Sequence, residues 1–256
     1  MRFSLIRKIV QSSVLAGIFI VPILNMLEIY FIRGSFISFD IGSAAIADPV
    51  MMFQTVLTRG EFAASLFAAI VIPALMAIFF GRVWCSFFCP YTTIMEILER
   101  IPFIKKAIWR KKPVKNSRYK RAVIFLSLLF MVGIAGLPLL NLISPPSALS
   151  VQAILIIKKT PTVEILFIVL AIGLEFYSLR FICRYICPTG TCLSFFVNSR
   201  SLSPIYMGEC LKCGKCAKVC PMGVEPTAEL PSSFCHNCGQ CIDACSDKRK
   251  PLRWKR

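Results

Sequence analysis

Residues 210–221 have the sequence CLKCGKCAKVCP, in which three cysteines at two-residue gaps are followed by a fourth cysteine and a proline. The same gaps recur from Cys235 to Cys245. Three cysteines at such gaps can surround one face of an iron–sulfur cubane, and the fourth is placed to ligate a second cluster. The spacing therefore predicts two [4Fe–4S] clusters.

The last cysteine of each run assigns the ligands, because each run gives that cysteine to the other cluster. The expected ligands are Cys210, Cys213, Cys216 and Cys245 for the first cluster, and Cys220, Cys235, Cys238 and Cys241 for the second. Zinc sites usually pair two Cys-x2-Cys knuckles across a long gap, and disulfides need an oxidising compartment. We therefore predict a small α+β domain of the bacterial 2[4Fe–4S] ferredoxin type at residues 207–247, with a role in electron transfer, and a basic tail at 248–256.

The composition of the remaining chain is typical of a membrane protein. Of the 256 residues, 56% are hydrophobic, and the mean hydropathy is +0.69. A helix needs about 20 apolar residues to cross a bilayer. Four stretches have that length, at about residues 9–32, 62–80, 121–143 and 163–182. The sequence therefore predicts an α-helical membrane protein, with four transmembrane helices in a domain that comprises residues 1–206.

The distribution of positive charge predicts the orientation of these helices. The formal net charge is +17, and residues 81–121 contain eleven Lys and Arg, whereas few lie in the loops on the opposite side. Positive residues favour the cytoplasmic side of a membrane and its anionic lipids. Both termini and the cluster domain are thus expected in the cytoplasm, where a reducing environment keeps thiols free. Membrane lipid, rather than nucleic acid, is the expected partner of the basic surface.

A second cysteine motif indicates that the membrane domain is duplicated. Arg82-x2-Cys85-x3-Cys89-Pro90 recurs as Arg180-x2-Cys183-x3-Cys187-Pro188, at a constant offset of 98 residues. The domain is therefore predicted to consist of two two-helix repeats. Proline fits best at the first position of a new helix, so the cysteine before it is expected to be the N-cap.

The repeated cysteines have two functional interpretations and one structural one. A thiol at a helix N-terminus beside arginine is expected to have a lowered pKa. A pseudo-twofold axis would bring the four into one redox or metal site at the cytoplasmic membrane edge, formed by Cys85, Cys89, Cys183 and Cys187. Two separate dithiol pairs, or four cysteines acting as small hydrophobes, are the alternatives. Cys192 has no counterpart and is predicted to be a plain buried thiol.

Taken in order, two spans, a Cys-x3-Cys-Pro motif, two more spans, a second motif and a double cluster run closely resemble the NapH-type ferredoxin membrane subunits, and MauN-type proteins look alike. The resemblance extends over nearly the whole chain, including Asp48-Pro49 and Ser144-Pro145. It implies a quinol dehydrogenase subunit in a bacterial cytoplasmic membrane. The implied partners are the membrane quinone pool and another iron–sulfur or cytochrome subunit.

Oxidation of quinol releases protons, so a carboxylate near the bilayer is needed to accept them. Glu28 and Glu175 are acidic residues inside predicted spans, where a charge is costly and suggests a function, and Asp48 is placed in the first outer loop. These three are the candidate proton acceptors. The only histidine, His236, is interpreted as a residue of a cluster loop.

Two other functions fit the same motifs. A metal-handling assembly protein could reduce copper or another ion at the repeated thiols, since soft metals prefer sulfur ligands. Alternatively, the chain could be a structural anchor that docks a soluble redox protein at the membrane. The amphipathic stretch at residues 91–109 is compatible with a helix on the inner membrane face or with one that packs against the cluster domain.

Overall fold

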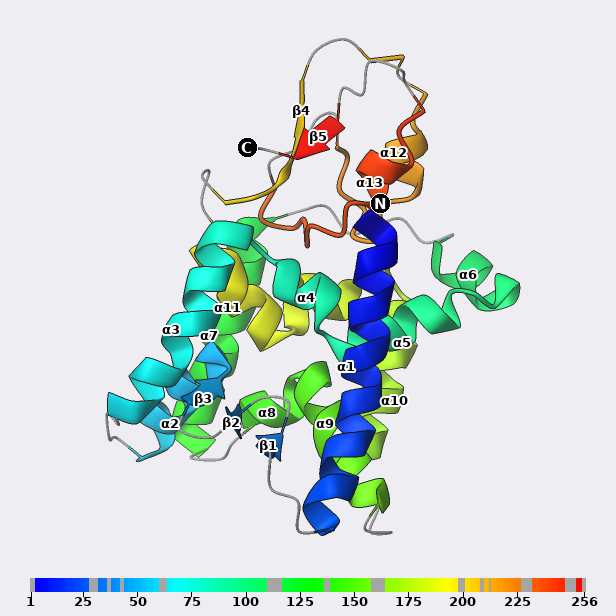
Figure 1. Cartoon of the computed structure of the whole chain (residues 1–256). Helices are drawn as coiled ribbons and strands as arrows, with labels where there is room; N and C mark the ends of the chain where they lie inside the picture. Colours follow the sequence, from blue (N-terminus) through cyan, green and yellow to red (C-terminus); the bar gives the residue numbers. More distant parts are fainter. Residues whose placement is uncertain are drawn as a thin grey trace.

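The structure is a computed structural model of the whole chain, and it describes the residues that follow. They are 3–27, 32–35, 38–41, 44–59, 64–109, 117–135, 139–157, 164–197, 201–207, 210–211, 213–226, 232–246 and 252–254. A large helical part is capped at one end by a small domain that contains both cysteine runs, and the N-terminus lies beside that domain (Figure 1).

The helical part contains twelve elements assigned as helix. They are α1 (Phe3–Met26), α2 (Pro49–Arg59), α3 (Ala64–Phe80), α4 (Val83–Phe87), α5 (Pro90–Leu98), α6 (Pro102–Trp109), α7 (Arg118–Ala135), α8 (Leu139–Ile143), α9 (Pro145–Ile157), α10 (Glu164–Glu175), the π-helix η1 (Ile182–Ile186) and α11 (Pro188–Phe196). A three-stranded antiparallel meander lies between α1 and α2, formed by β1 (Ile32–Ser35), β2 (Ser38–Ile41) and β3 (Ala44–Ala47). The sequence analysis placed this segment in a loop.

Helix α1 has the properties of a membrane span. It has 24 residues, and only Arg7 and Gln11 are buried. Among the described residues, α1 alone is both long enough and apolar enough to cross a bilayer. Shorter apolar helices occupy residues 68–80, 145–157 and 165–175.

The ends of the expected spans differ from the prediction. The first helix begins at Phe3 and ends at Met26, six residues before the expected end at residue 32. The third expected span is divided into α7 and α8, and Pro138, between them, lies outside the described residues. The fourth ends at Glu175, where the chain turns before η1, and Arg180 in this turn has a φ of 52°. Apolar composition alone did not reveal these breaks, because backbone turns depend on local conformation.

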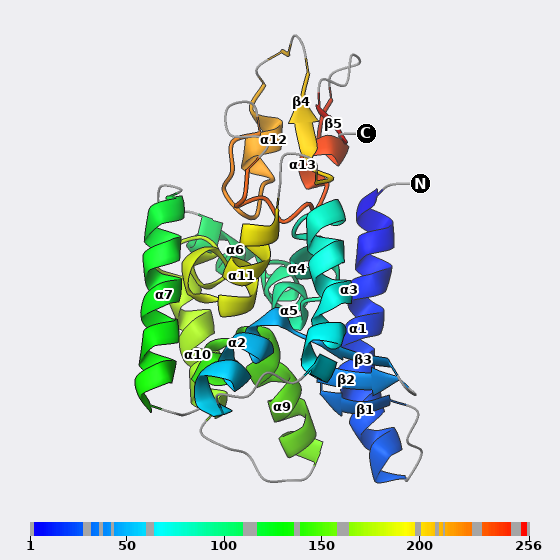
Figure 2. The same cartoon turned by 90° about the vertical axis from the view of Figure 1, so that its left-hand side faces the viewer.

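The described helices pack as a bundle into which short segments enter from both ends. From the end near the cluster domain come α4, α5 and α11, and from the opposite end come α2 and α9 (Figure 2). Helix α11 contacts α2, α5 contacts α9, and α9 also packs against α1 and α10. The segments that follow the two Cys-x3-Cys-Pro motifs therefore meet the segments around Asp48 and Ser144 inside the molecule.

The C-terminal domain has a short strand pair and two single-turn helices. Strand β4 (Pro204–Tyr206) pairs antiparallel with β5 (Leu252–Trp254), which lies in the predicted basic tail. Helices α12 (Lys215–Lys218) and α13 (Gln240–Asp243) each follow a glycine with positive φ, Gly214 at 67° and Gly239 at 72°. The two cysteine runs thus fold alike, because each needs a left-handed residue before its helical turn.

The domain is joined to the helical part through the end of α3. The side-chain amide of Asn237 donates to the carbonyl oxygens of Phe80, at 2.8 Å, and Leu202, at 2.5 Å. Leu202 N–H donates to the carbonyl of Phe79 at 2.7 Å. Since these bonds satisfy carbonyls at the end of a helix, they fix the cluster domain at that position.

Candidate functional site

The two repeated motifs fold in matching ways around their prolines. Cys89 is the N-cap of α5 and Cys187 is the N-cap of α11, each with proline at the first helical turn. This confirms the predicted capping arrangement. Before Cys187 the chain forms a π-helix, in which Cys187 N–H donates to the carbonyl of Ile182 at 2.8 Å. Such π segments occur often at functional sites.

The four repeated cysteines line one small cavity, here called the thiol cavity. Its lining comprises Cys85, Cys89, Cys183 and Cys187 with Arg82, Thr92, Arg180, Gly190, Met222 and His236, and its volume is about 20 Å³. Both repeats therefore contribute to a single place rather than to two distant pairs. Among the described residues, no three histidine, cysteine or acidic side chains lie close enough together to hold a metal ion.

Burial raises the pKa of Cys89, Cys183 and Cys187, contrary to the expected lowering. Desolvation raises the pKa of Cys89 to about 11, and the neighbouring thiolate of Cys85 adds to the rise. The pKa of Cys183 also rises through burial, and the charge of Arg180 only partly offsets it. The prediction of a low pKa was wrong because desolvation disfavours the thiolate more than one nearby arginine favours it. Any metal would have to displace thiol protons.

Four buried arginines surround the thiol cavity and its contact with the cluster domain. They are Arg82, Arg121, Arg180 and Arg184, each no more than 2% exposed. Arg180 pairs with Glu99 at 2.9 Å. Arg82 and Arg121 have no acidic partner in the described part of the chain, and Arg82 Nε and Arg121 Nη2 are buried without an acceptor there. Unpaired buried charge is unfavourable, so this arrangement fits an anionic group at the site.

The ligand type and the charge of these residues, though not the volume of the cavity, suit a thiolate-ligated iron–sulfur cluster. It supplies the missing negative charge, and the four cysteines are the ligand type that such clusters use. Arg82 donates to the carbonyl of Cys183 at 3.3 Å, so it lies against the second thiol pair. When bound, the cluster would supply one-electron chemistry, and the arginines would lower the cost of its charge.

The same arginines also contact the second-cluster loop, which we define as residues 233–241. Arg82 donates to the carbonyl oxygens of Ser233 and Phe234 at 3.3 and 3.4 Å. Arg121 donates to Ser233 at 3.2 Å, and its guanidinium lies 3.6 Å from the Phe234 ring centroid. His236 is part of both the loop and the thiol cavity lining. The two places where a cluster is expected are therefore adjacent.

The cysteines of the C-terminal domain fall into two electrostatic groups. Burial is the main cause that raises the pKa of Cys235, Cys238 and Cys241, and the thiolate of Cys220 adds to the rise in all three. The thiolates of Cys210 and Cys213 act in the same way on Cys216. Cys245 follows α13. Cys220 therefore lies within electrostatic range of the second run, and Cys216 of the first run also acts on Cys241, so the crossed ligand sets stay a prediction.

Cys192 is not part of the thiol cavity. It is 2% exposed and packs with Val50, Phe125 and Leu140. Burial raises its pKa to about 12. It is a buried thiol in an apolar cluster, as predicted.

Glu175 is fully buried at the end of α10, and its Oε1 accepts a hydrogen bond from the Tyr91 hydroxyl at 3.0 Å. Its Oε2 has no partner within the described ranges. The Tyr91 hydroxyl also lies 3.4 Å from the carbonyl of Ala171. Glu28, the other acidic residue expected in a span, is outside the described residues.

Asp48 lies directly before α2, and its carboxylate is hydrogen-bonded to α11. It accepts hydrogen bonds from Thr189 Oγ1 at 2.6 Å and from Val50 N–H at 3.0 Å, and Ser144 lies 3.2 Å from the same hydroxyl. Burial raises its pKa, although these bonds partly lower it. Thr189 is two residues beyond Cys187, so the segment before α2, which the sequence places in the first outer loop, turns inward to meet α11.

An apolar cavity of about 200 Å³, here called the lipid-side cavity, lies between α8, α9, α10 and η1. Ala171 and Leu174 line it from α10, next to the Tyr91–Glu175 pair, and Ile182 and Ile186 line it from the π-helix that contains Cys183. An apolar cavity close to a buried carboxylate is typical of a site for an apolar ligand with a polar head.

Sequence reasoning missed Tyr91, Arg121 and Arg184 as site residues. Tyr91 and Arg184 follow directly on motif residues, which is a local signal that could have been used. Arg121 begins a predicted span and was counted only as a positive-inside residue. Its contact with the carbonyl of Arg184, at 2.8 Å, joins residues far apart in the sequence.

Comparisons with known proteins agree with the two kinds of cysteine motif. A family described as "4Fe-4S binding domain" matches residues 62–115 and 160–198, each of which contains one Cys-x3-Cys-Pro motif. A second, described as "4Fe-4S dicluster domain", matches residues 198–256. No solved structure shows significant similarity to the chain.

Several curated proteins match most of the chain. An uncharacterized protein of Methanocaldococcus jannaschii is 26% identical over 186 residues, 70% of this chain and 75% of that protein. The ferredoxin-type protein NapH of Escherichia coli is 22% identical over 264 residues, 96% of this chain and 87% of NapH. The methylamine utilization ferredoxin-type protein MauN of Paracoccus denitrificans is 27% identical over 233 residues, 89% and 78% respectively. Over most of its length the chain is thus similar to the NapH-type and MauN-type ferredoxin proteins, and its iron–sulfur motifs support a role in electron transfer.

Proposed function

We propose that the chain is a membrane subunit that oxidises quinol and passes the electrons through iron–sulfur clusters to a redox partner. The observation that supports this most directly is the adjacency of the thiol cavity, the second-cluster loop and the Tyr91–Glu175 pair. A substrate site, a proton acceptor and a chain of electron carriers are the three parts that quinol oxidation needs.

The proposed path begins at the lipid-side cavity. A quinol ring fits an apolar cavity of this size, and its tail would extend into the bilayer. Glu175 Oε2 is available to accept a proton, while Tyr91 donates to Oε1 and orients the carboxylate. Two electrons and two protons leave each quinol. We propose Asp48, whose carboxylate accepts a hydrogen bond from Thr189, as the acceptor of the second proton.

The electrons would then pass through three centres. The first is held at the thiol cavity by Cys85, Cys89, Cys183 and Cys187, and the others by the two sets of C-terminal ligands predicted from the spacing. The unpaired charges of Arg82 and Arg121 support a centre at the thiol cavity. His236 and the second-cluster loop form the short connection onward.

Four crossings of the membrane, by α1, α3, α7 and α10, remain our proposal. Large apolar side chains on these helices are exposed, which in water would form an unfavourable patch. Examples are Phe19 on α1, Phe79 on α3, Phe130 on α7 and Leu166 on α10. The shorter helices would cross together with the turns that follow them. We propose that the cluster domain faces the cytoplasm, as the positive charges predict.

The test is to reconstitute the purified protein in liposomes under anaerobic conditions, add a reduced menaquinol analogue and record the EPR signals of the clusters. We expect a quinol-dependent change that Ala148→Leu, which fills the lipid-side cavity, slows by at least about tenfold, or 1.4 kcal/mol. Ala122→Leu, on α7 and away from this cavity, is the matched control. Failure of quinol to change any signal would refute the proposal.

Metal handling is the second candidate, and the size of the thiol cavity favours it. A volume of about 20 Å³ accommodates a single ion or water more readily than a cluster. Iron and sulfide contents of Cys89→Ser, Cys187→Ser and the double variant distinguish the two functions. A shared cluster predicts that each single change removes about four irons and that the double change removes no more. If all variants retain the iron of the wild type, and cupric reduction is lost instead, metal handling is correct.

A further inference from the structure

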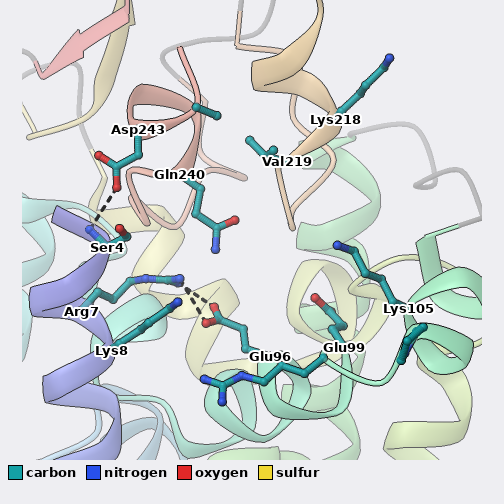
Figure 3. A pocket seen from close by; sticks show the side chains of 13 residues that line it. Ser4, Arg7, Lys8, Glu96, Glu99, Lys105, Lys218, Val219, Gln240 and Asp243 are labelled. Carbon is teal, nitrogen blue, oxygen red and sulfur yellow. Dashed lines mark hydrogen bonds and ion pairs between the residues drawn. The ribbon is translucent and has the colours of Figure 1, made fainter. Parts of the chain in front are cut away.

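A charged cleft of about 860 Å³ lies where the helical part meets the cluster domain. One wall comes from α1 and contains Ser4, Arg7 and Lys8, and the floor and opposite wall come from α5 and α6 (Figure 3). The cluster domain forms the upper side through Lys218, Val219, Gln240 and Asp243.

The cleft reaches the polypeptide that holds the predicted clusters. Val219 directly precedes Cys220, and Gln240 directly precedes Cys241. The side-chain amide of Gln240 can be oriented so that both its nitrogen and its oxygen are hydrogen-bonded. The nitrogen then donates to the carbonyl of Val219, and the oxygen accepts from Arg7, each at 2.8 Å. A protein seated in the cleft would therefore be separated from the second cluster by little more than its ligand loops.

The acidic groups of the cleft are already occupied. Glu96 forms two bonds with Arg7, at 2.6 and 3.1 Å, and Glu99 lies 2.9 Å from Arg180. Asp243 accepts from the backbone N–H of Ser4 at 3.2 Å. These pairs hold the walls together, and they leave little negative charge to face a ligand.

The basic groups are arranged differently. Lys8, Arg100 and Lys218 line the cleft from α1, from the end of α5 and from α12, and all three are exposed. In the described part of the chain none of them has an acidic partner within 4.0 Å. Lys105 adds a fourth cation to the lining. The accessible charge of the cleft is therefore positive on three sides.

We propose that this cleft docks the acidic surface of a soluble one-electron redox protein. The chemistry favours a protein over a small molecule, because small-ligand sites are mostly apolar with few polar groups, whereas this one is wide and charged. Complementary charge steers weak electron-transfer encounters and aligns the partners. The direction of flow rests on the proposed function: a reduced cluster of this chain loses one electron, the partner's centre gains it, and no bond is made or broken.

The test measures binding, so that it does not depend on quinol. The full chain with its clusters is placed in nanodiscs of neutral phosphatidylcholine, and an oxidised, acidic 2[4Fe–4S] ferredoxin is titrated at low and high ionic strength. The cleft variant is Lys8→Glu/Arg100→Glu/Lys218→Glu. The control variant, Lys106→Glu/Arg118→Glu/Lys120→Glu, makes the same change of charge at exposed residues outside the cleft.

We expect the cleft variant to bind at least about tenfold more weakly at low salt, and the control variant to bind as the wild type does. High salt should reduce the difference. Equal affinity of the wild type and the cleft variant, or an equal loss in both variants, would overturn the proposal. So would binding of poly-L-glutamate as tight as that of the ferredoxin, since the site would then be a general anion site. A chain that binds ferredoxin but gives no quinol-dependent EPR change would refute only the proposed quinol oxidation.

Discussion

Arg82 connects the two redox regions through one guanidinium group. It donates to the carbonyl of Cys183 on one side and to those of Ser233 and Phe234 on the other. Its repeat counterpart, Arg180, instead pairs with Glu99. The two motif arginines therefore differ: Arg180 is paired with a carboxylate, whereas Arg82 keeps its charge available for the centre that we propose at the thiol cavity.

Replacing Arg82 with methionine should lower the reduction potential of the centre at the thiol cavity. The reduced form carries more negative charge, and it would lose a neighbouring cation. We expect a fall of about 60 mV or more, a tenfold change in the equilibrium constant of a one-electron couple. An EPR-monitored redox titration measures it, with Arg100→Met at an exposed position as the control. An unchanged potential would limit Arg82 to a structural role.

Cys192 should make the folded state sensitive to alkaline pH. Its pKa is raised to about 12 by burial, whereas an unfolded thiol titrates near 8.5. Between these values the unfolded state binds fewer protons, so stability is complete below about pH 8.5 and falls by up to about 1.4 kcal/mol per pH unit as pH rises toward 12.

The measurement is the thermal midpoint between pH 8 and 10 for the wild type and Cys192→Ala. The variant should be less stable at pH 8, since it creates a cavity, but its midpoint should decline less steeply with pH. Val50→Ala, in the same apolar cluster, is the control and should keep the steep decline. Parallel slopes for the wild type and Cys192→Ala would contradict the assignment.

At the scale of elements, the first turn of α1 supports the cluster domain. The Phe3 ring lies 4.7 Å from that of Trp254 in β5 and 5.4 Å from that of Phe87 in α4. Gly239, which begins the helical turn of the second cysteine run, approaches Phe3 so closely that a Cβ would lie 2.6 Å from the ring. Helix α1, which is long and apolar enough to cross a membrane, therefore also positions a cluster loop.

Gly239→Ala should destabilise the second cluster loop more than Gly214→Ala destabilises the first. Both glycines have positive φ, which costs an alanine about 1–2 kcal/mol, but only Gly239 would also clash, since nothing lies within 4 Å of a Cβ at Gly214. The rate of cluster loss on heating, followed by visible absorbance, compares them. Phe3→Ala should partly rescue Gly239→Ala; equal effects of the two glycine variants would show that the contact with α1 is unimportant.

At the scale of the whole molecule, the structure places the cluster domain, the basic helix α6 and the N-terminus at one end (Figure 1). The meander β1–β3 and helix α2 lie toward the other end. The second motif repeat enters from the cluster end, and its Thr189 contacts Asp48 and Ser144 in the interior. This arrangement places the proposed electron path on one side and the buried carboxylate of Asp48 on the other.

Fusions should report the proposed orientation in cells. Green fluorescent protein attached after Arg256 should fluoresce, because it folds in the cytoplasm, and alkaline phosphatase at the same point should be inactive. Phosphatase fused after Arg59, in the predicted outer segment, is the matched control and should be active. Phosphatase activity only at Arg256 would mean that the positive-inside argument fails for this chain.

Features that depend on the spacing of nearby residues could be predicted from the amino-acid sequence alone. The gaps between Cys210 and Cys245 predicted cluster ligands, and the position of Pro90 and Pro188 predicted that helices begin there, because proline restricts the backbone of its immediate neighbours. The repeat of the Cys-x3-Cys-Pro motif could also be recognised from its spacing. Local spacing is sufficient wherever ligands or caps are a few residues apart.

Features that depend on burial and on contacts between distant residues could be found only in the folded structure. Arg121 meets the carbonyl of Arg184, and Asp48 meets Thr189, although neither pair is close in the chain. The sequence predicted a lowered pKa for Cys89, whereas burial in the folded structure raises it, because desolvation depends on every group that packs around the thiol. A sequence lists charges and thiols, but their cost and their partners are set by which residues the fold removes from water together.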